Sequence, residues 1–434
     1  MNQESATELT RSINLPSAVF IIIGYVVGAT IFILPGSLAA DTGPAVFVAY
    51  MLAGIPAIIA GIVMAQIGSA LPVSGANFVL IRDALSPYAG FIYVWIMISM
   101  AAVVIPLVAL GFADYFGHFI PGIDSRLLAM SLIVVFIILN SLGVSVAAAA
   151  QNVLVVVFLV ALLVFGIGGV MNGDASLLQP LFPKGVSPLA LAAITAFFSY
   201  AGVFVIAEIA GEIKNPGRNI PLAILLSFVV IILLYTLVPL ALNMTIPWNE
   251  LGETRMVVVT ASQMFLPKPL VTLIAVSALF AAATSVNGIL LGLSRDFFQG
   301  ANSGLFPAAF ARINAKTHVP FNAVLLVGGL ALIGAAIGGA ITSYAQLALI
   351  GVMIIQIMTG IALIRLPAVM PDVYNKSEFK LGRAGLWIVG ILFIVFSIGF
   401  LALLAAERTG LLLIGLIFLA VGVIYQLIWT RINN

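Results

Sequence analysis

The stretch GYVVGATIFILPG, from Gly24 to Gly36, lies inside an apolar run that is long enough to cross a membrane, yet it carries glycines at 24 and 28. A glycine costs a helix interior about 1 kcal/mol relative to alanine, so this helix is easily interrupted there. A second long apolar run contains FFSYAGVF at 197–204, with Gly202 near its middle. Two interrupted segments five spans apart predict an inverted repeat whose first helices are unwound at mid-membrane.

The composition of the whole chain agrees with a membrane protein. Of 434 residues, 63% are hydrophobic and 7% are charged, and the mean hydropathy is +1.26. Soluble domains carry about 25% charged residues, so lipid is the expected solvent. Twelve spans of about 20 residues would use about 240 residues, which leaves short loops and no separate soluble domain. The absence of Cys excludes disulfides and thiolate metal sites, and two His residues are too few for a His-rich metal centre. A net charge of +2 is too small to suggest a nucleic-acid partner.

Apolar runs bounded by charges, Gly or Pro predict an all-α polytopic protein of 12 transmembrane helices. The first six spans are Leu15–Ala40, Pro44–Gly68, Pro87–Ala113, Leu127–Ala147, Asn152–Met171 and Pro188–Gly211. The second six are Pro221–Leu242, Lys268–Leu293, Asn322–Gly339, Ser343–Ile364, Gly385–Ala405 and Gly410–Trp429. The expected division is an N-terminal segment at 1–14, a first repeat at 15–171, a second repeat at 188–364 and two trailing helices at 385–429.

Basic residues predict the orientation in a cytoplasmic membrane. With residues 1–14 in the cytoplasm, 12 of the 17 basic residues fall in cytoplasmic segments, which the positive-inside rule favours for both termini. Those twelve are Arg11, Arg82, Lys214, Arg218, Arg295, Arg312, Lys316, Arg365, Lys376, Lys380, Arg383 and Arg431; the other five are Arg126, Lys184, Arg255, Lys268 and Arg408. The N-terminal segment holds Glu4, Glu8 and a single Arg, and no cleavage-like site ends a short apolar core, so we expect the first span to be retained.

Unwound backbone in a membrane needs partners, because each unsatisfied N–H or C=O group costs several kcal/mol in lipid. A zwitterion supplies them: the N-terminal end of one half-helix attracts a carboxylate and the C-terminal end of the other attracts an ammonium group. The alternative is that the glycines only allow close helix packing, as small residues do in many membrane bundles.

Four blocks of sequence resemble the amino acid–polyamine–organocation (APC) superfamily of secondary transporters. They are IIGYVVGATIF at 22–32, LPVSGANFVLIRDALSPYAGF at 71–91, EIAGEIKNPGRNIPLAI at 208–224 and GLFPAAFARIN at 304–314. The third is the most specific, because Pro216 and Pro221 bracket the link between two helices. The resemblance implies the five-plus-five inverted-repeat (LeuT-type) fold, with helices 1 and 6 unwound and helices 11 and 12 outside the core.

The resemblance also implies a substrate site at the two breaks. The residues expected there are Ile23, Gly28, Ala29, Thr30 and Ile31 in helix 1, with Phe198, Ser199, Gly202 and Phe204 in helix 6. The carboxylate would bind the backbone of residues 29–31, and the amino group would bind carbonyls near Ile23 and at 198–202. Phe198 is a gating aromatic residue or an ordinary core residue. Thr30 replaces the family's third glycine, which favours a small ligand, and Phe204 replaces the usual Glu, which disfavours a strongly cationic one.

Glu208 is the one carboxylate that the predicted spans place clearly inside a helix. An unpartnered charge at the bilayer centre costs at least about 2.5 kcal/mol, so a functional role for Glu208 is expected. The role is to carry a proton or gate the transporter, or to bind a substrate amine directly. The alternative is that Glu208 lies near the membrane surface and is solvated there. In a continuous helix Glu212 would be its neighbour, with Lys214 or Arg218 as partners. Some proton-coupled relatives have a helix-5 lysine in place of a sodium ion, but this chain has none near Phe158. Sodium ligation by Thr284 and Ser285 is a further alternative.

These observations predict a secondary active transporter that moves small, neutral amino acids by alternating access, coupled to protons or acting as an exchanger. An organic amine permease with Glu208 as counter-charge is the alternative within transport. A channel or a non-transporting membrane sensor is the alternative of another class. We expect no enzymatic activity and no cofactor beyond a proton or sodium as coupling ion. The bilayer and a small molecule are the expected partners, and helices 11 and 12 offer one surface for a homodimer.

Overall fold

The computed structural model describes residues 11–120, 122–254, 256–338, 341–407 and 409–433. Most of the expected N-terminal segment, together with Arg255 and Arg408, lies outside this part of the chain. The α-helices that correspond to the first six predicted spans are α1 (Leu15–Val27), α2 (Thr30–Thr42), α3 (Val46–Ala70), α5 (Pro87–Phe119), α6 (Ser125–Leu142), α7 (Val144–Asn172), α8 (Ser187–Phe198) and α9 (Val205–Glu208). Those of the second six are α10 (Pro216–Thr245), α13 (Lys268–Asn302), α14 (Phe321–Ile337), α15 (Ile341–Val369), α17 (Arg383–Glu407) and α18 (Thr409–Asn433).

Shorter helices lie in the connections and in the interrupted sixth span. The α-helices among them are α4 (Ala76–Ala84), α11 (Trp248–Leu251), α12 (Val257–Ser262) and α16 (Pro371–Lys376), and the 3₁₀ helices are η1 (Ala175–Leu178), η2 (Ala201–Phe204), η3 (Ala210–Glu212) and η4 (Ala308–Ala311). Extended pairing within the described residues is limited to one isolated bridge between Ile13 and Ile213. The all-α prediction is therefore confirmed.

Nine helical segments in the described residues are long and apolar enough to cross a membrane. Three shorter apolar helices, at Leu15–Val27, Phe321–Ile337 and Gly415–Trp429, coincide with predicted spans 1, 9 and 12. Large apolar side chains are exposed on the outer faces of the bundle; on α10, for example, Leu226, Val229 and Leu233 are exposed at helical spacing. A multi-pass membrane protein is confirmed, whereas the number twelve stays a prediction.

Two predicted span boundaries are wrong in ways that affect the site. Spans 4 and 5 meet at Gly143, which has φ +139°, and not in a loop at 148–151; the alanines at 147–150 continue α7 because nothing in them interrupts a helix. Span 8 was expected to end at Leu293, before the first charges, but α13 continues to Asn302. The charged residues Arg295 and Asp296 therefore lie inside a helix.

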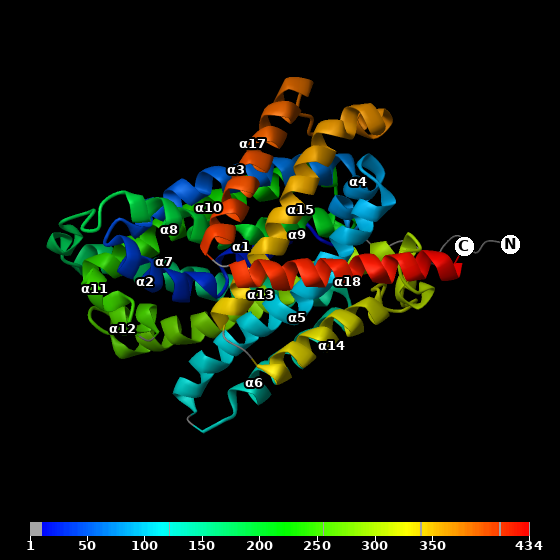
Figure 1. Ribbon diagram of the computed structural model, residues 1–434. Helices are drawn as coiled ribbons and strands as arrows, with labels where there is room; N and C mark the ends of the chain where they lie inside the picture. The colour runs from blue at the N-terminus through cyan, green and yellow to red at the C-terminus, as the bar shows by residue number, and fades with distance from the viewer. Residues whose placement is uncertain (1–10, 121, 255, 339–340, 408, 434) are drawn as a thin grey trace.

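The long helices form two groups that pack mainly within themselves. The first group consists of α1, α3, α8 and α10, and the second of α5, α6, α13 and α14; α7 contacts both. Figure 1 shows α5, α6 and α14 of the second group side by side at the lower right. The helices α15, α17 and α18 pack on one another and on the outside of the two groups, through α5 and α3.

The two ends of the described chain lie at the same end of the bundle. Ile13 N donates to Glu212 O, Arg295 near the C-terminal end of α13 pairs with Glu212, and Trp429 Nε1 in α18 donates to Gly304 O just after α13. This arrangement fits an even number of crossings. We call it the terminal end of the bundle below.

Candidate substrate and coupling sites

The first interrupted span is divided into α1 and α2 by a turn at Gly28 and Ala29. Gly28 has φ +31°, and a Cβ placed on it would lie 1.9 Å from Ser285 Oγ on α13. Only glycine suits this position, because other residues rarely adopt a positive φ and the hydroxyl leaves no room for a side chain. The next helix, α2, begins at Thr30 without a side-chain cap from Ala29, and within the described residues the first-turn N–H of Phe32 donates to Ala29 O.

The sixth span is interrupted at the predicted position. The helix α8 ends at Phe198, the chain turns through Ser199 and Tyr200, and a short 3₁₀ segment follows before α9. A Cβ on Gly202 would lie 2.7 Å from Tyr25 C and Val26 N, so the backbones of the two interrupted spans are in direct contact. Both predicted interruptions are present: a turn divides the first span, and the sixth changes from α-helical to 3₁₀ geometry at 199–204.

Tyr235 on α10 links the two breaks. Its hydroxyl oxygen lies 2.6 Å from Val26 O, 3.0 Å from Ser199 O and 3.2 Å from Thr30 Oγ1. A tyrosine has one hydrogen to donate, so the two carbonyls compete for it. The sequence analysis missed Tyr235, although a tyrosine at the middle of an apolar span is itself a signal, because a buried hydroxyl usually has a hydrogen-bond partner.

The other predicted substrate residues are buried to different degrees. Ile23, Ala29 and Ile31 are buried, whereas Phe198 and Phe204 are half-buried. The Phe204 ring packs on Phe393 of α17, with 6.3 Å between ring centroids, so it contacts a helix outside the two groups. The structure therefore brings together Gly28, Thr30, Ser199 and Gly202 through direct contacts or through Tyr235, and it places Phe204 at the side of this region.

The residues suggested for sodium lie next to helix 1, and the Thr284 hydroxyl is within hydrogen-bonding distance of two backbone carbonyls. Thr284 Oγ1 is within donating distance of Gly24 O, at 3.0 Å, and of Ala281 O, at 2.7 Å. Two side chains of α7 face Gly24, one helical turn from the break: a Cβ on Gly24 would lie 2.2 Å from Gln151 Nε2 and 2.7 Å from Val155 Cγ2. Phe158 is not among the side chains nearest to Gly24, and its match to the helix-5 position stays a prediction.

Backbone carbonyls fix the direction of this amide network. Asn140 Nδ2 donates to Phe136 O and to Asn287 Oδ1, and Asn287 Nδ2 donates to Ala147 O and to Gln151 Oε1. Because carbonyls only accept, the two asparagine amides cannot be reversed, and Gln151 must turn its nitrogen toward helix 1. That nitrogen is buried and donates no hydrogen bond within the described residues. Donors facing helix 1 do not suit sodium, since hard cations take oxygen ligands.

Glu208 is not the lone buried carboxylate. Tyr93 on α5 donates its hydroxyl hydrogen to Glu208 Oε1 at 2.9 Å or to Asp296 Oδ1 at 3.1 Å, and all three side chains are buried. The sequence analysis placed Asp296 in a loop because the apolar run ends before it. A charged residue can continue a buried helix when a partner from elsewhere in the fold meets it, and such a partner is invisible in the apolar pattern.

Glu212 does not share a helix face with Glu208, because the α-helix ends at Glu208 and η3 follows. Glu212 pairs with Arg295, whose Nε and Nη2 lie 2.7 Å and 3.2 Å from the two carboxylate oxygens. Both side chains have 0% of their surface exposed. The partner of Glu212 is therefore Arg295, which the sequence analysis places in a cytoplasmic segment, and not Lys214 or Arg218.

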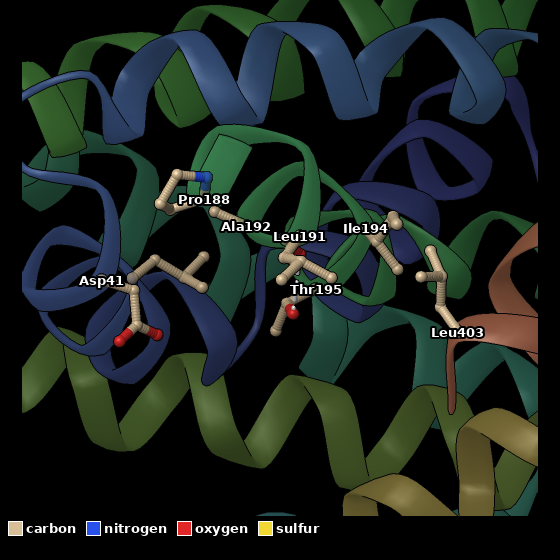
Figure 2. A pocket seen from close by; sticks show the side chains of 8 residues that line it. Asp41, Pro188, Leu191, Ala192, Ile194, Thr195 and Leu403 are labelled. Atoms are coloured by element: carbon tan, nitrogen blue, oxygen red, sulfur yellow. Dashed lines mark hydrogen bonds between the residues drawn. The ribbon is translucent and has the colours of Figure 1, made fainter. Parts of the chain in front are cut away.

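A cavity of about 450 Å³ lies away from these residues, between α2, α8 and α17. It is lined by Leu38, Asp41, Pro188, Leu191, Ala192, Ile194, Thr195 and Leu403. Figure 2 shows Asp41 at one side and Leu403 at the other, with the α8 side chains between them. The Thr195 hydroxyl donates back to Leu191 O in its own helix, and no predicted substrate residue lines the cavity. This cavity is therefore distinct from the predicted substrate site.

An all-helical, multi-pass protein whose first and sixth spans are broken side by side is a transporter of the LeuT-type fold. Comparison with known families agrees: the amino acid permease family matches residues 13–428. The chain belongs to this family, within the APC superfamily, and its members are transporters and not enzymes. No group of three or more His, Asp or Glu side chains in the described residues is arranged to hold a metal ion.

Similar proteins of known function are transporters of several small molecules. The methylthioribose transporter of Bacillus subtilis (strain 168) is 26% identical over 402 residues, which cover 87% of this chain and 85% of the relative. The branched-chain amino acid permease BcaP of the same organism is 23% identical over 434 residues, covering 94% and 90%. The cystine/glutamate transporter of Homo sapiens is 27% identical over 345 residues, covering 76% and 69%.

Proposed function

We propose that this protein moves small, neutral amino acids across the cytoplasmic membrane by alternating access, with the substrate bound between the two broken spans. The observation that carries the proposal is the direct contact between the two interrupted spans, where Gly202 meets the backbone of Tyr25 and Val26. The start of α2, which Ala29 does not cap with its side chain, follows shortly after Val26 in the sequence. Free N–H groups at a helix start attract a carboxylate, and carbonyls at a helix end attract an ammonium group.

Neutrality of the substrate follows from the residues at the breaks. Residues 28–31 and 198–204 contain no charged side chain, so a substrate with a charged side chain would lack a partner there. Thr30 and Tyr235 also occupy space beside the breaks, which favours a small substrate. Amino acid substrates are supported by the family and by the branched-chain permease among the relatives.

Alternating access is supported by the two groups of helices. The breaks belong to spans of the first group, while Thr284 and Ser285, which lie against helix 1, belong to the second. Rocking of one group against the other would open the breaks to one side of the membrane at a time. We place the terminal end of the bundle in the cytoplasm, on the strength of the excess of basic residues there. The two repeats would then be 15–171 and 188–364.

Counterflow in proteoliposomes tests this function. Vesicles preloaded with one unlabelled amino acid should accumulate the same labelled amino acid, and a panel of neutral, cationic and anionic amino acids and simple amines defines the substrate class. The proposal fails if amines drive counterflow while no amino acid does, which is the result expected of an amine permease. Uptake that never saturates and shows no counterflow would indicate a channel, and no flux at all would favour a sensor.

The position of the substrate is tested with Gly28→Leu. We expect this variant to insert normally and to lose counterflow, because a side chain at residue 28 meets the Ser285 hydroxyl in a backbone conformation that disfavours any side chain. The matched control is Gly329→Leu on α14, since a Cβ there contacts nothing within 4 Å. Normal counterflow by Gly28→Leu would exclude the break in helix 1 as the substrate site.

A further inference from the structure

Three buried side chains at the terminal end of the bundle form what we call the acid cluster: Glu208 on α9, Tyr93 on α5 and Asp296 on α13. Their exposed fractions are 4%, 0% and 1%. The Tyr93 hydroxyl oxygen lies 2.9 Å from Glu208 Oε1 and 3.1 Å from Asp296 Oδ1, so it holds the two carboxyl groups near each other. Nothing in the proposed substrate site uses these residues.

The acid cluster lacks one hydrogen. Tyr93 has a single hydrogen for two carboxylates, and Glu208 Oε2 is buried without a hydrogen-bond partner in the described residues. Two ionised carboxylates cannot bond to each other because neither has a hydrogen to donate. A proton bound to Glu208 would turn one of its oxygens into a donor and leave one negative charge to share the Tyr93 hydrogen, so a proton is the simplest ligand that relieves the cluster.

Among the described residues, no basic side chain forms an ion pair with the acid cluster. Arg295, next in sequence to Asp296, is occupied by both oxygens of Glu212 on η3. On α4, Arg82 binds Asp83 and Ser303. The helix α1 contributes Tyr25, whose ring lies against Gly288 of α13, and α3 and η2 contain no Asp, Glu, Lys, Arg or His. With both acids ionised, two negative charges would be buried together without compensation.

The acid cluster also spans the boundary between the two helix groups. Glu208 belongs to the sixth span, whose α8 packs in the first group, whereas Tyr93 and Asp296 belong to α5 and α13 of the second. The cluster therefore joins elements that rocking would separate. Separation would expose the carboxyl groups to water, where both ionise easily, and closure would again require one proton between them.

We propose that the acid cluster is the binding site of one transported proton, which joins the two helix groups when bound and leaves for the cytoplasm when they separate. The inference rests on the proposed transport function and names its coupling ion. A proton-loaded carrier can still exchange substrate, so exchange needs no proton release. Net uptake requires the proton to leave before the empty carrier returns.

The experiment compares exchange with net uptake in proteoliposomes, using an amino acid that the wild type carries in counterflow. For the wild type, we expect an inward gradient of about two pH units, a ~100-fold ratio of proton activity, to accelerate uptake and to bring protons into the lumen, where a trapped pH-sensitive dye reports them. Glu208→Gln and Asp296→Asn each replace an acid by an amide with a permanent hydrogen. Both should retain counterflow within about threefold and lose acceleration by the pH gradient.

Control variants separate the proton site from general damage. Asp372→Asn neutralises an exposed acid on α16 and should behave as wild type. Tyr93→Phe removes the donor that stabilises the ionised acids while leaving both in place, so the pH of half-maximal uptake should rise. Size-exclusion chromatography in detergent verifies folding. If neither amide variant folds, proton entry with substrate in the wild type decides the question.

The possible outcomes are distinguishable. If the wild type shows counterflow but its net uptake is not accelerated by a proton gradient, the proton site is overturned and the transport function stays intact. Acceleration that persists in both amide variants, or that follows a sodium gradient instead, also overturns it. Absence of amino acid counterflow in the wild type overturns the proposed function, and with it the proton site.

Discussion

Alanine at residue 202 tests the contact between the two breaks. In the structure, a Cβ on Gly202 would lie 2.7 Å from Tyr25 C and Val26 N and 2.9 Å from Tyr25 O. These are backbone atoms, which cannot rotate away as a side chain can. Ordinary contacts of a Cβ begin at about 3.4 Å, so the two spans must move apart by about 0.7 Å to admit the methyl group.

The cost of that movement sets the expected effect. Overpacking a closely packed site costs about 1–3 kcal/mol, which corresponds to a ~5- to ~150-fold loss in the population of the arrangement seen here. We expect the turnover of counterflow to fall within this range. Tyr235 is affected as well, because its hydroxyl lies within hydrogen-bonding distance of a carbonyl on each side of the contact.

The assay is the initial rate of amino acid counterflow, normalised to the protein inserted in the vesicles. Gly329→Ala is the matched control: a Cβ there contacts nothing, and alanine in a helix interior is favourable by up to about 1 kcal/mol. Wild-type turnover by a folded Gly202→Ala protein would refute the reasoning, since the two breaks would then not need to meet during transport.

Three further predictions follow from the buried polar groups. Arg295→Met should lower the free energy of unfolding in detergent by about 3–5 kcal/mol, because it leaves the Glu212 charge buried without a partner; adding Glu212→Gln should restore part of that loss, and no recovery would contradict the pairing. Tyr235→Phe should lower the thermal stability by an amount equivalent to about 1–3 kcal/mol, because it leaves buried carbonyls without their donor; an unchanged melting temperature would argue against the link between the breaks. Replacing sodium by choline at constant pH should leave uptake unchanged, because the Gln151 amide turns a donor toward helix 1; a dependence on sodium would refute that reading of the network.

The broken spans were predictable from the sequence because their cause is local. Glycine lowers the stability of a helix wherever it occurs, and Gly28 and Gly202 stand in the middle of apolar runs that are otherwise long enough to cross a membrane. The predicted substrate residues at the breaks were named from the resemblance to the APC superfamily and not from the glycines. Whether they bind an amino acid is a question for the transport experiments.

The partners of the buried charges could not be read from the chain. Glu208 and Asp296 are 88 positions apart, and Glu212 and Arg295 are 83 apart. A search for apolar runs ends a span at the first charged residue, so it placed Arg295 and Asp296 in a loop. That rule fails where a distant side chain satisfies the charge, because the cost of burial then depends on the partner and not on the residue.

The sequence by itself determined that lipid is the solvent of this protein and where its first and sixth helices are interrupted, since composition and helix propensity act on each segment separately. The tertiary structure alone decided which side chains meet at those interruptions. Tyr235 lies near both broken spans, Gln151 turns its amide nitrogen to helix 1, and Glu208 shares a tyrosine hydroxyl with Asp296. Such contacts join separate helices, and their geometry exists only once the helices have packed.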